Sequence, residues 1–249
     1  MGKLTLFYKI ILNELKKELY TAWSYKGQWL GEFTSLIAFF FFLNAMTNHS
    51  MVTGSTYCFW FYSILIMGDI SGKVSMEMHM GTFEQIYLSP IPISILFISK
   101  AITAILKSFI IMSMLLFFLS LLGYVNLSFF HQQTFLALLV ITPGLFGISL
   151  FLGGLVMLLK NIGWIINIFN NSFLFLSGIF LSVDSLPNAL QIISKLLPIS
   201  QAVQILNGFA DLEYLLKIVT LNTFYFCIGL YFFYLCEKVA KKKGLLGYY

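Results

Sequence analysis

The residue types that most often carry catalysis are scattered in this sequence. His49, His79 and His131 lie in separate segments and form no HExxH or comparable pair. The nearest string to a phosphate-binding loop, residues 68–74, has the wrong glycine spacing and ends in Val where the motif needs Ser or Thr. The 3 cysteines lie in apolar stretches without metal or disulfide spacing. We therefore expect no enzyme activity, no metal site and no cofactor in this chain.

Charged residues inside apolar stretches are the next candidates, because a charge in a membrane is costly and usually serves pairing or transport. The sequence offers Glu32, Asp69, Lys73 and Lys107. Asp69 and Lys73 can pair along one helix face. Lys107 can extend toward the membrane surface or meet Glu32 or Asp69 between helices. We interpret these charges as structural pairs, and a substrate or proton path is the alternative.

Polar and small residues share one face of a later apolar stretch. They are Gly163, Asn167, Asn170 and Asn171. Such residues let two helices approach closely and form hydrogen bonds between them. Asn167 and Asn171 are therefore expected to lie at a helix contact, and a substrate lining is the alternative.

The composition indicates that these polar residues lie in a membrane protein. Of the 249 residues, 59% are hydrophobic and only 10% are charged, and the mean hydropathy is +0.88. A soluble domain is about half apolar and a quarter charged. We therefore expect an all-α integral membrane protein.

The apolar blocks predict six transmembrane helices, since about 20 helical residues cross a hydrocarbon core of about 30 Å. We place these spans at residues 29–47, 54–72, 102–124, 134–159, 162–181 and 215–236. The third helix can begin as early as residue 93. Together they form a membrane domain over residues 29–237, with no separate soluble module.

The lysines predict the orientation, because short cytoplasmic loops carry an excess of basic residues. With the N-terminus inside, only Lys195 and Lys217 fall on the outer side and Lys107 lies within the membrane. The cytoplasmic side then holds Lys3, Lys9, Lys16, Lys17, Lys26, Lys73, Lys100, Lys160, Lys238, Lys241, Lys242 and Lys243. We expect a cell-membrane protein with both termini in the cytoplasm. The net charge of +5 is thus explained by topology, and nucleic acid is not an expected partner.

Both ends of the chain are predicted to lie outside the lipid core. In residues 1–28, apolar residues recur at three- and four-residue steps opposite a lysine-bearing face, which is typical of an interfacial helix. This helix either anchors the chain to membrane lipid or docks a cytoplasmic partner. Residues 238–249 form a basic tail.

The segment between the fifth and sixth predicted spans, residues 183–211, is apolar but interrupted by Pro187, Pro198 and Gly208. Ser185 can cap a short helix with Pro187 in its first turn. Pro198 ends that helix, and a second can follow. Two such pieces suit an outer re-entrant hairpin, and an irregular loop is the alternative.

A polar connection follows the second predicted span, over residues 73–92. Met76, Met80, Phe83 and Ile86 recur at helical spacing, and prolines at 90 and 92 end the pattern. We expect an amphipathic cytoplasmic helix that contacts a partner protein or lies on the membrane surface. Alternatively, a helix begins just after Thr82.

This connection resembles a motif of the ABC type 2 export permeases, in which an acidic residue precedes Gly-Thr-x-Glu and then Ser-Pro. The matching residues are Glu77, Gly81, Thr82, Glu84, Ser89 and Pro90. The outer segment is also similar to that family, with Ser-Gly-Ile-Phe at 177–180, Leu-Pro at 186–187, Leu-Pro-Ile-Ser at 197–200 and Leu-Asn-Gly at 206–208.

The resemblance implies the membrane subunit of an exporter that works with a second permease subunit and a separate ATPase dimer. ATP and Mg²⁺ would bind to the ATPase, and Glu77, Gly81, Thr82 and Glu84 would transmit force from it. The motif is closer to drug-type members, which favours a drug, an antimicrobial peptide or another amphipathic substrate over a polysaccharide. Met78-His79-Met80 and Asn207 depart from the family, which often has Arg at these positions.

Two other classes of protein fit the composition. An ion-coupled transporter or channel would use Glu32, Asp69 and Lys107 for coupling. A non-transporting membrane protein, such as an immunity factor, would lack a partner ATPase.

Overall fold

The computed structural model describes residues 3–24, 26–46, 54–88, 93–125, 132–159, 163–178, 183–206 and 211–244. These residues are helical, with short turns and no strand in the described ranges, so the all-α prediction is confirmed. The elements are α1 Lys3–Ser24, α2 Lys26–Met46, α3 Gly54–His79, α4 Phe83–Leu88, α5 Ile93–Leu121, α6 Gln132–Leu159, α7 Gly163–Leu176, η2 Val183–Ser185, α8 Asn188–Leu196, α9 Pro198–Leu206 and α10 Leu212–Lys242.

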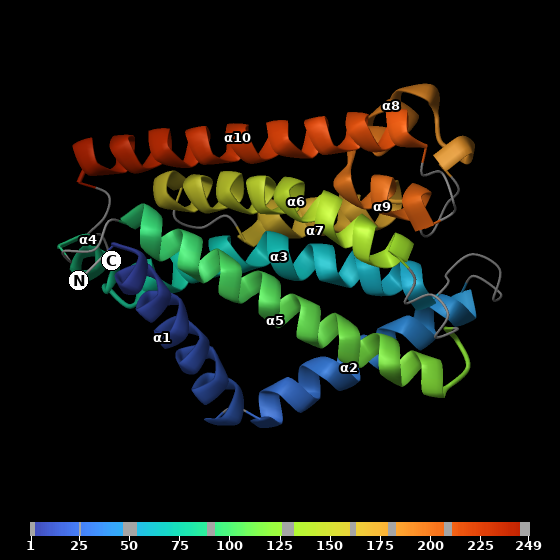
Figure 1. Ribbon diagram of the computed structural model, residues 1–249, viewed down its shortest axis with the longest axis horizontal. Coiled ribbons are helices and arrows are strands. Elements are labelled where there is room, and N and C mark those ends of the chain that lie inside the picture. Colours follow the sequence, from blue (N-terminus) through green and yellow to red (C-terminus); the bar gives the residue numbers. More distant parts are fainter. Residues whose placement is uncertain are drawn as a thin grey trace.

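α3, α6 and α10 run along the longest axis of the molecule, and α5 crosses it at a slant (Figure 1). α6 packs most extensively on α10, and α3 packs on α6 and α5. α1 and α2 form a V on the other side of α5, with α1 packed on α5. The beginning of α1, the end of α10 and α4 lie at one end of the molecule, and α8 and α9 lie at the other.

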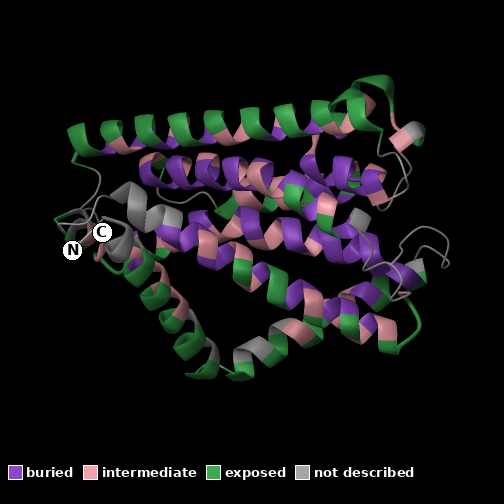
Figure 2. Ribbon diagram, in the orientation of Figure 1, coloured by how far each residue is buried: buried purple, intermediate pink, exposed green. Residues whose placement is uncertain are grey.

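α3 and α6 form the centre of the bundle, where buried residues predominate (Figure 2). Hydroxyl groups join them at two levels: the hydroxyls of Tyr62 and Thr142 are 2.9 Å apart, and Ser149 donates to the Met67 carbonyl at 3.1 Å. The outward face of α10 is exposed along its length, as expected for a face that meets lipid or another subunit.

Glycines allow α6 and α10 to approach each other at backbone distance. A Cβ atom added to Gly147 would lie 2.3 Å from the Tyr225 carbonyl oxygen, and one added to Gly229 would lie 2.1 Å from the Gly147 carbonyl oxygen. Small residues are common where membrane helices cross, because without a bulky side chain the two backbones can approach closely.

Three described helices are long and apolar enough to cross a membrane: Ser99–Leu121 within α5, Thr134–Leu159 within α6, and α10. They correspond to the third, fourth and sixth predicted spans. The first and fifth correspond to shorter apolar helices, Phe33–Ala45 and Gly163–Leu176. The second predicted span corresponds to α3, which is rich in hydroxyl groups and largely enclosed by protein. A helix in such a position needs less apolar surface than a helix that faces lipid. The six-span topology stays a prediction.

The segment predicted to lie on the outer side folds as two short helices, α8 and α9, bent by 84° at their junction. Pro187 occupies the N-cap position of α8, so the predicted cap by Ser185 is wrong. Ser194 and Ser200 both donate to the Leu176 carbonyl at the end of α7, at 2.5 and 3.1 Å. These bonds satisfy a helix-end acceptor and attach the bent pair to α7. Whether the pair re-enters the membrane stays a prediction.

Candidate functional site

The turn between α3 and α4 is the most distinctive local structure of the predicted coupling segment. Gly81 has φ of +67°, a left-handed conformation that glycine adopts without penalty. The Thr82 amide donates to the Glu77 carbonyl at 3.1 Å, and the Gly81 amide donates to the Met78 carbonyl at 3.1 Å. This pair of bonds is the Schellman motif, which ends a helix by satisfying its last carbonyl groups.

This turn corrects the expectation of one continuous amphipathic helix. α3 continues to His79 and carries Met76, whereas Phe83 and Ile86 belong to α4, so the apolar spacing was shared by two helices. The alternative of a helix that begins just after Thr82 is confirmed. Nothing lies within 4 Å of a Cβ atom built on Gly81, so the conformation of this glycine, and not crowding within the chain, explains its presence.

Glu77 joins the turn to the next long helix. Its carboxylate accepts hydrogen bonds from the Thr82 hydroxyl at 2.5 Å and from the Lys100 ammonium of α5 at 2.8 Å. The Thr82 hydroxyl also lies 3.2 Å from the Glu77 carbonyl oxygen. One acidic side chain therefore holds the end of α3, the turn before α4 and the beginning of α5 together.

The Glu77–Lys100 ion pair is largely removed from solvent, with side-chain exposures of 17% and 4%. Burial by itself would raise the pKa of the Glu77 carboxyl. Hydrogen bonds from Lys100 and Thr82, with the positive charges of Lys100 and Lys17, outweigh burial and lower this pKa below its ordinary value. These contacts therefore favour the ionised form of Glu77 in its link to Lys100 and Thr82.

Exposed apolar residues surround this braced turn. Met76 at the end of α3, Met80 in the turn and Leu88 at the end of α4 all project apolar side chains into solvent. Gln85 on α4 is also exposed. Large apolar side chains left exposed close to a turn are residues that a protein partner can cover.

The family model for the ABC-2 type transporter matches residues 8–209, which is most of the chain. The chain belongs to the ABC-2 type transporter family. No curated protein matches its sequence. The chain is accordingly a multi-pass membrane protein and the permease component of a transporter. This role does not itself involve catalysis.

In this ABC-2 permease, three of the predicted coupling residues meet at one turn: Glu77, Gly81 and Thr82. Glu84 lies in the first turn of α4, and its side chain lies outside the described residues. The structure therefore accounts for the local role of the acidic residue, the glycine and the threonine of the motif. Their part in coupling to an ATPase stays a prediction.

The predicted polar residues of the membrane region are dispersed. Asp69 and Lys73 lie 2.8 Å apart on α3, so the predicted pair forms. Lys107 is half-buried on α5, and Glu32 belongs to α2 with its side chain outside the described residues. Asn167 and Asn171 are exposed on α7, and their packing role stays a prediction. Within the described ranges, no group of three or more His, Cys, Asp or Glu side chains could hold a metal ion.

The sequence analysis did not single out Lys100 and Asn222, which are both buried. The orientation rule assigns Lys100 to the cytoplasmic side, but a lysine among the apolar residues of α5 also indicates a buried partner. Asn222 on α10 is 1% exposed, and its amide donates to Gln201 of α9 at 2.8 Å and to the Ile218 carbonyl at 2.9 Å. A lone asparagine in an apolar span was the available signal.

Proposed function

We propose that this chain is the six-span membrane subunit of an ABC exporter in the cell membrane, with both termini in the cytoplasm. The six spans would lie within α2, α3, α5, α6, α7 and α10. Two permease subunits, identical or related, would form the pathway. The substrate would be a drug, an antimicrobial peptide or another amphipathic compound. A separate ATPase dimer would bind ATP and Mg²⁺ and supply the energy.

The braced turn between α3 and α4 is the observation that carries this proposal. It lies at the same end of the molecule as the beginning of α1 and the end of α10, where the lysines predict the cytoplasm (Figure 1). A push on α4 would reach α3 through the Gly81 turn and α5 through the Glu77–Lys100 pair. Closure of the ATPase dimer could therefore move two membrane helices together.

Site-specific cross-linking tests this proposal directly. In a variant without native cysteines, Gln85→Cys on α4 should cross-link to the ATPase that co-purifies with the chain, and ATP should change the yield. Ala189→Cys, exposed on α8 at the opposite end, is the matched control and should give no cross-link. Equal cross-linking from both positions, or from Ala189→Cys alone, would contradict the assigned contact. Export that does not require ATP would favour an ion-coupled transporter instead.

A further inference from the structure

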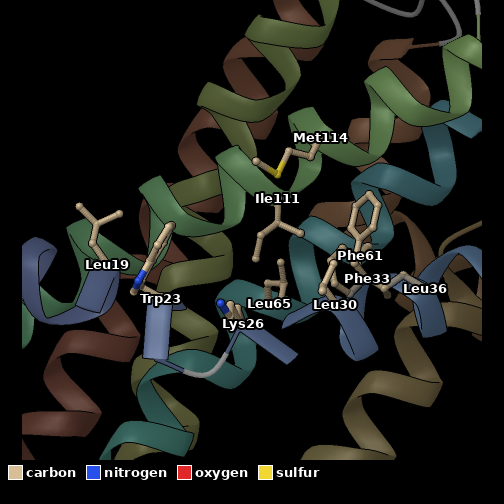
Figure 3. Close-up of a pocket in the computed structure, with 10 residues that line it drawn as sticks. All are labelled: Leu19, Trp23, Lys26, Leu30, Phe33, Leu36, Phe61, Leu65, Ile111 and Met114. Carbon is tan, nitrogen blue, oxygen red and sulfur yellow. The ribbon is translucent and has the colours of Figure 1, made fainter. Parts of the chain in front are cut away.

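A cavity of about 500 Å³ opens where α1 and α2 diverge from the bundle (Figure 3). Its volume lies within the range of about 300 to 1,000 Å³ that is usual for small-molecule sites. α1, α2, α3 and α5 all contribute to its lining, and Lys26 is the one charged residue among the ten that Figure 3 labels. The described lining of this groove is therefore apolar apart from the Lys26 ammonium.

The single cation of the described lining lies toward the α1 side of the groove, and the far side is apolar. Trp23 and Lys26 lie toward one end, with the Lys26 ammonium 5.8 Å from the centre of the Trp23 ring. Leu36 and Phe61 lie toward the other end, and Leu65 and Ile111 lie between. Tryptophan and lysine are typical of the membrane interface, where an apolar body meets hydrocarbon and a polar tip meets headgroups.

Much of the apolar lining is uncovered in the isolated chain. Leu19, Trp23, Leu30 and Met114 are 68%, 79%, 67% and 58% exposed, although all four line the groove. In a membrane protein such a surface meets acyl chains instead of water. An occupant that lies along the groove would cover apolar surface from all four helices at once.

We propose that this groove binds one anionic phospholipid, with an acyl chain between α2 and α5 and the phosphate at Lys26. Among the described residues that line the groove, none carries a carboxylate. α2 also begins at Lys26, so the first amide groups of a long helix belong to the same turn as this lysine and favour an anion. The bound lipid would fill the space between the interfacial helix α1 and the span helices, and would fix the angle of the V.

Lipid binding can be measured on the purified chain by native mass spectrometry and by the shift in thermal unfolding. Dioleoyl phosphatidylglycerol should bind and stabilise more than dioleoyl phosphatidylcholine, because only the first keeps a net negative charge. Dihexanoyl phosphatidylglycerol and inorganic phosphate should do little, because neither fills the apolar part. Equal responses to the two dioleoyl lipids, or a full response to phosphate alone, would overturn the proposal.

Two variants separate the charge from the groove. Lys26→Gln should weaken phosphatidylglycerol binding about fivefold, since a lysine near an anionic surface contributes about 1 kcal/mol. Lys16→Gln, an exposed lysine of α1 outside the groove, is the matched control and should bind normally. Leu65→Trp should fill the floor of the groove and abolish the preference for long chains.

If Lys26→Gln bound phosphatidylglycerol as tightly as the unmodified protein, the proposed phosphate site at Lys26 would be wrong. A shift produced by an alkyl maltoside but not by phosphatidylglycerol would also overturn it, because the groove would then bind a neutral amphiphile such as an exported compound. If Leu65→Trp does not fold, the comparison of chain lengths on the unmodified protein still decides the question. These measurements use neither ATPase nor nucleotide, so their failure would leave the proposed export function standing.

Discussion

The ammonium of Lys100, near the beginning of α5, lies 2.8 Å from the carboxylate of Glu77, near the end of α3. The chain between these two residues contains the Gly81 turn and α4. The ion pair therefore closes a loop of about two dozen residues at its base and links the motif turn to both α3 and α5. This closure makes the turn a fixed shape that a partner can push.

Removing one member of this pair should destabilise the protein strongly. Lys100→Met leaves the Glu77 carboxylate largely buried without its cation, which typically costs about 3 to 5 kcal/mol. The double variant Glu77→Gln with Lys100→Met removes both charges and should recover a substantial part of that loss. Thermal or denaturant unfolding in detergent measures the difference.

The exposed pair Lys217–Glu213 on α10 provides the control for this experiment. Its atoms are 2.6 Å apart, but its side chains are 71% and 81% exposed. Lys217→Met should leave stability unchanged, because solvent already screens the pair. A double variant no more stable than Lys100→Met would contradict the compensation expected for Glu77 and Lys100.

The left-handed turn predicts how strongly different substitutions of Gly81 destabilise it. Gly81→Ala should weaken the turn by about 1 to 2 kcal/mol, because φ of +67° places Cβ near the following carbonyl. Gly81→Asn should be milder, since asparagine adopts this conformation more readily. The space around the site is open, so size alone should have no effect. Measured export should follow conformational tolerance, and Ala better tolerated than Asn would contradict this account.

Acidification should reveal the contribution of Glu77. A carboxyl group whose pKa is lowered by folding stabilises the folded state above its unfolded pKa, and this contribution disappears as pH falls through the folded pKa. The stability difference between the unmodified protein and Glu77→Gln should therefore be largest near neutral pH and shrink in acid, where Glu77 becomes neutral. Unfolding temperatures of both proteins across acidic pH provide the measurement. A difference that grew in acid would show that Glu77 is not a stabilised anion.

The glycine contact between α6 and α10 should tolerate no added carbon. Gly147→Ala should lower stability, because its Cβ would collide with the backbone of Tyr225 and force the helices apart. Gly72→Ala on α3 is the matched control, since nothing lies within 4 Å of its Cβ position. Alanine there should be neutral or stabilising by up to about 1 kcal/mol through helix propensity. Equal effects at both sites would contradict the close contact.

The sequence predicts an all-helical membrane protein, because apolar composition is summed over many residues and does not depend on any single position. It also predicts the breaks at Pro187 and Pro198, since proline acts locally on the backbone. The position at which α3 ends was harder to predict from the sequence. Its apolar spacing continues from Met76 to Phe83, and only the left-handed conformation of Gly81 shows that two helices share the pattern.

Contacts between residues that are distant in the sequence could not be predicted from the sequence pattern. Asp69 and Lys73 are one helical turn apart, so their pairing follows from helix geometry. Glu77 and Lys100 belong to different helices, and Asn222 and Gln201 likewise. Such contacts depend on how helices cross, which periodicity along one helix does not specify. A charged or amide residue in an apolar span signals that a partner exists without naming it.

Glu84 provides the most direct test of coupling, because it lies in α4 beyond the braced turn and outside the predicted spans. Glu84→Lys should insert and express normally, since the Glu77–Lys100 brace is unchanged. It should nevertheless lose export and weaken ATPase co-purification, because a reversed charge at an interface costs several kcal/mol. Lysine in the first turn of a helix also opposes the helix dipole, so Glu84→Asp, which keeps the charge at that position, is the control and should retain both activities. A Glu84→Lys protein that exports and co-purifies normally would remove Glu84 from the coupling surface and leave α4 as a segment on the membrane surface.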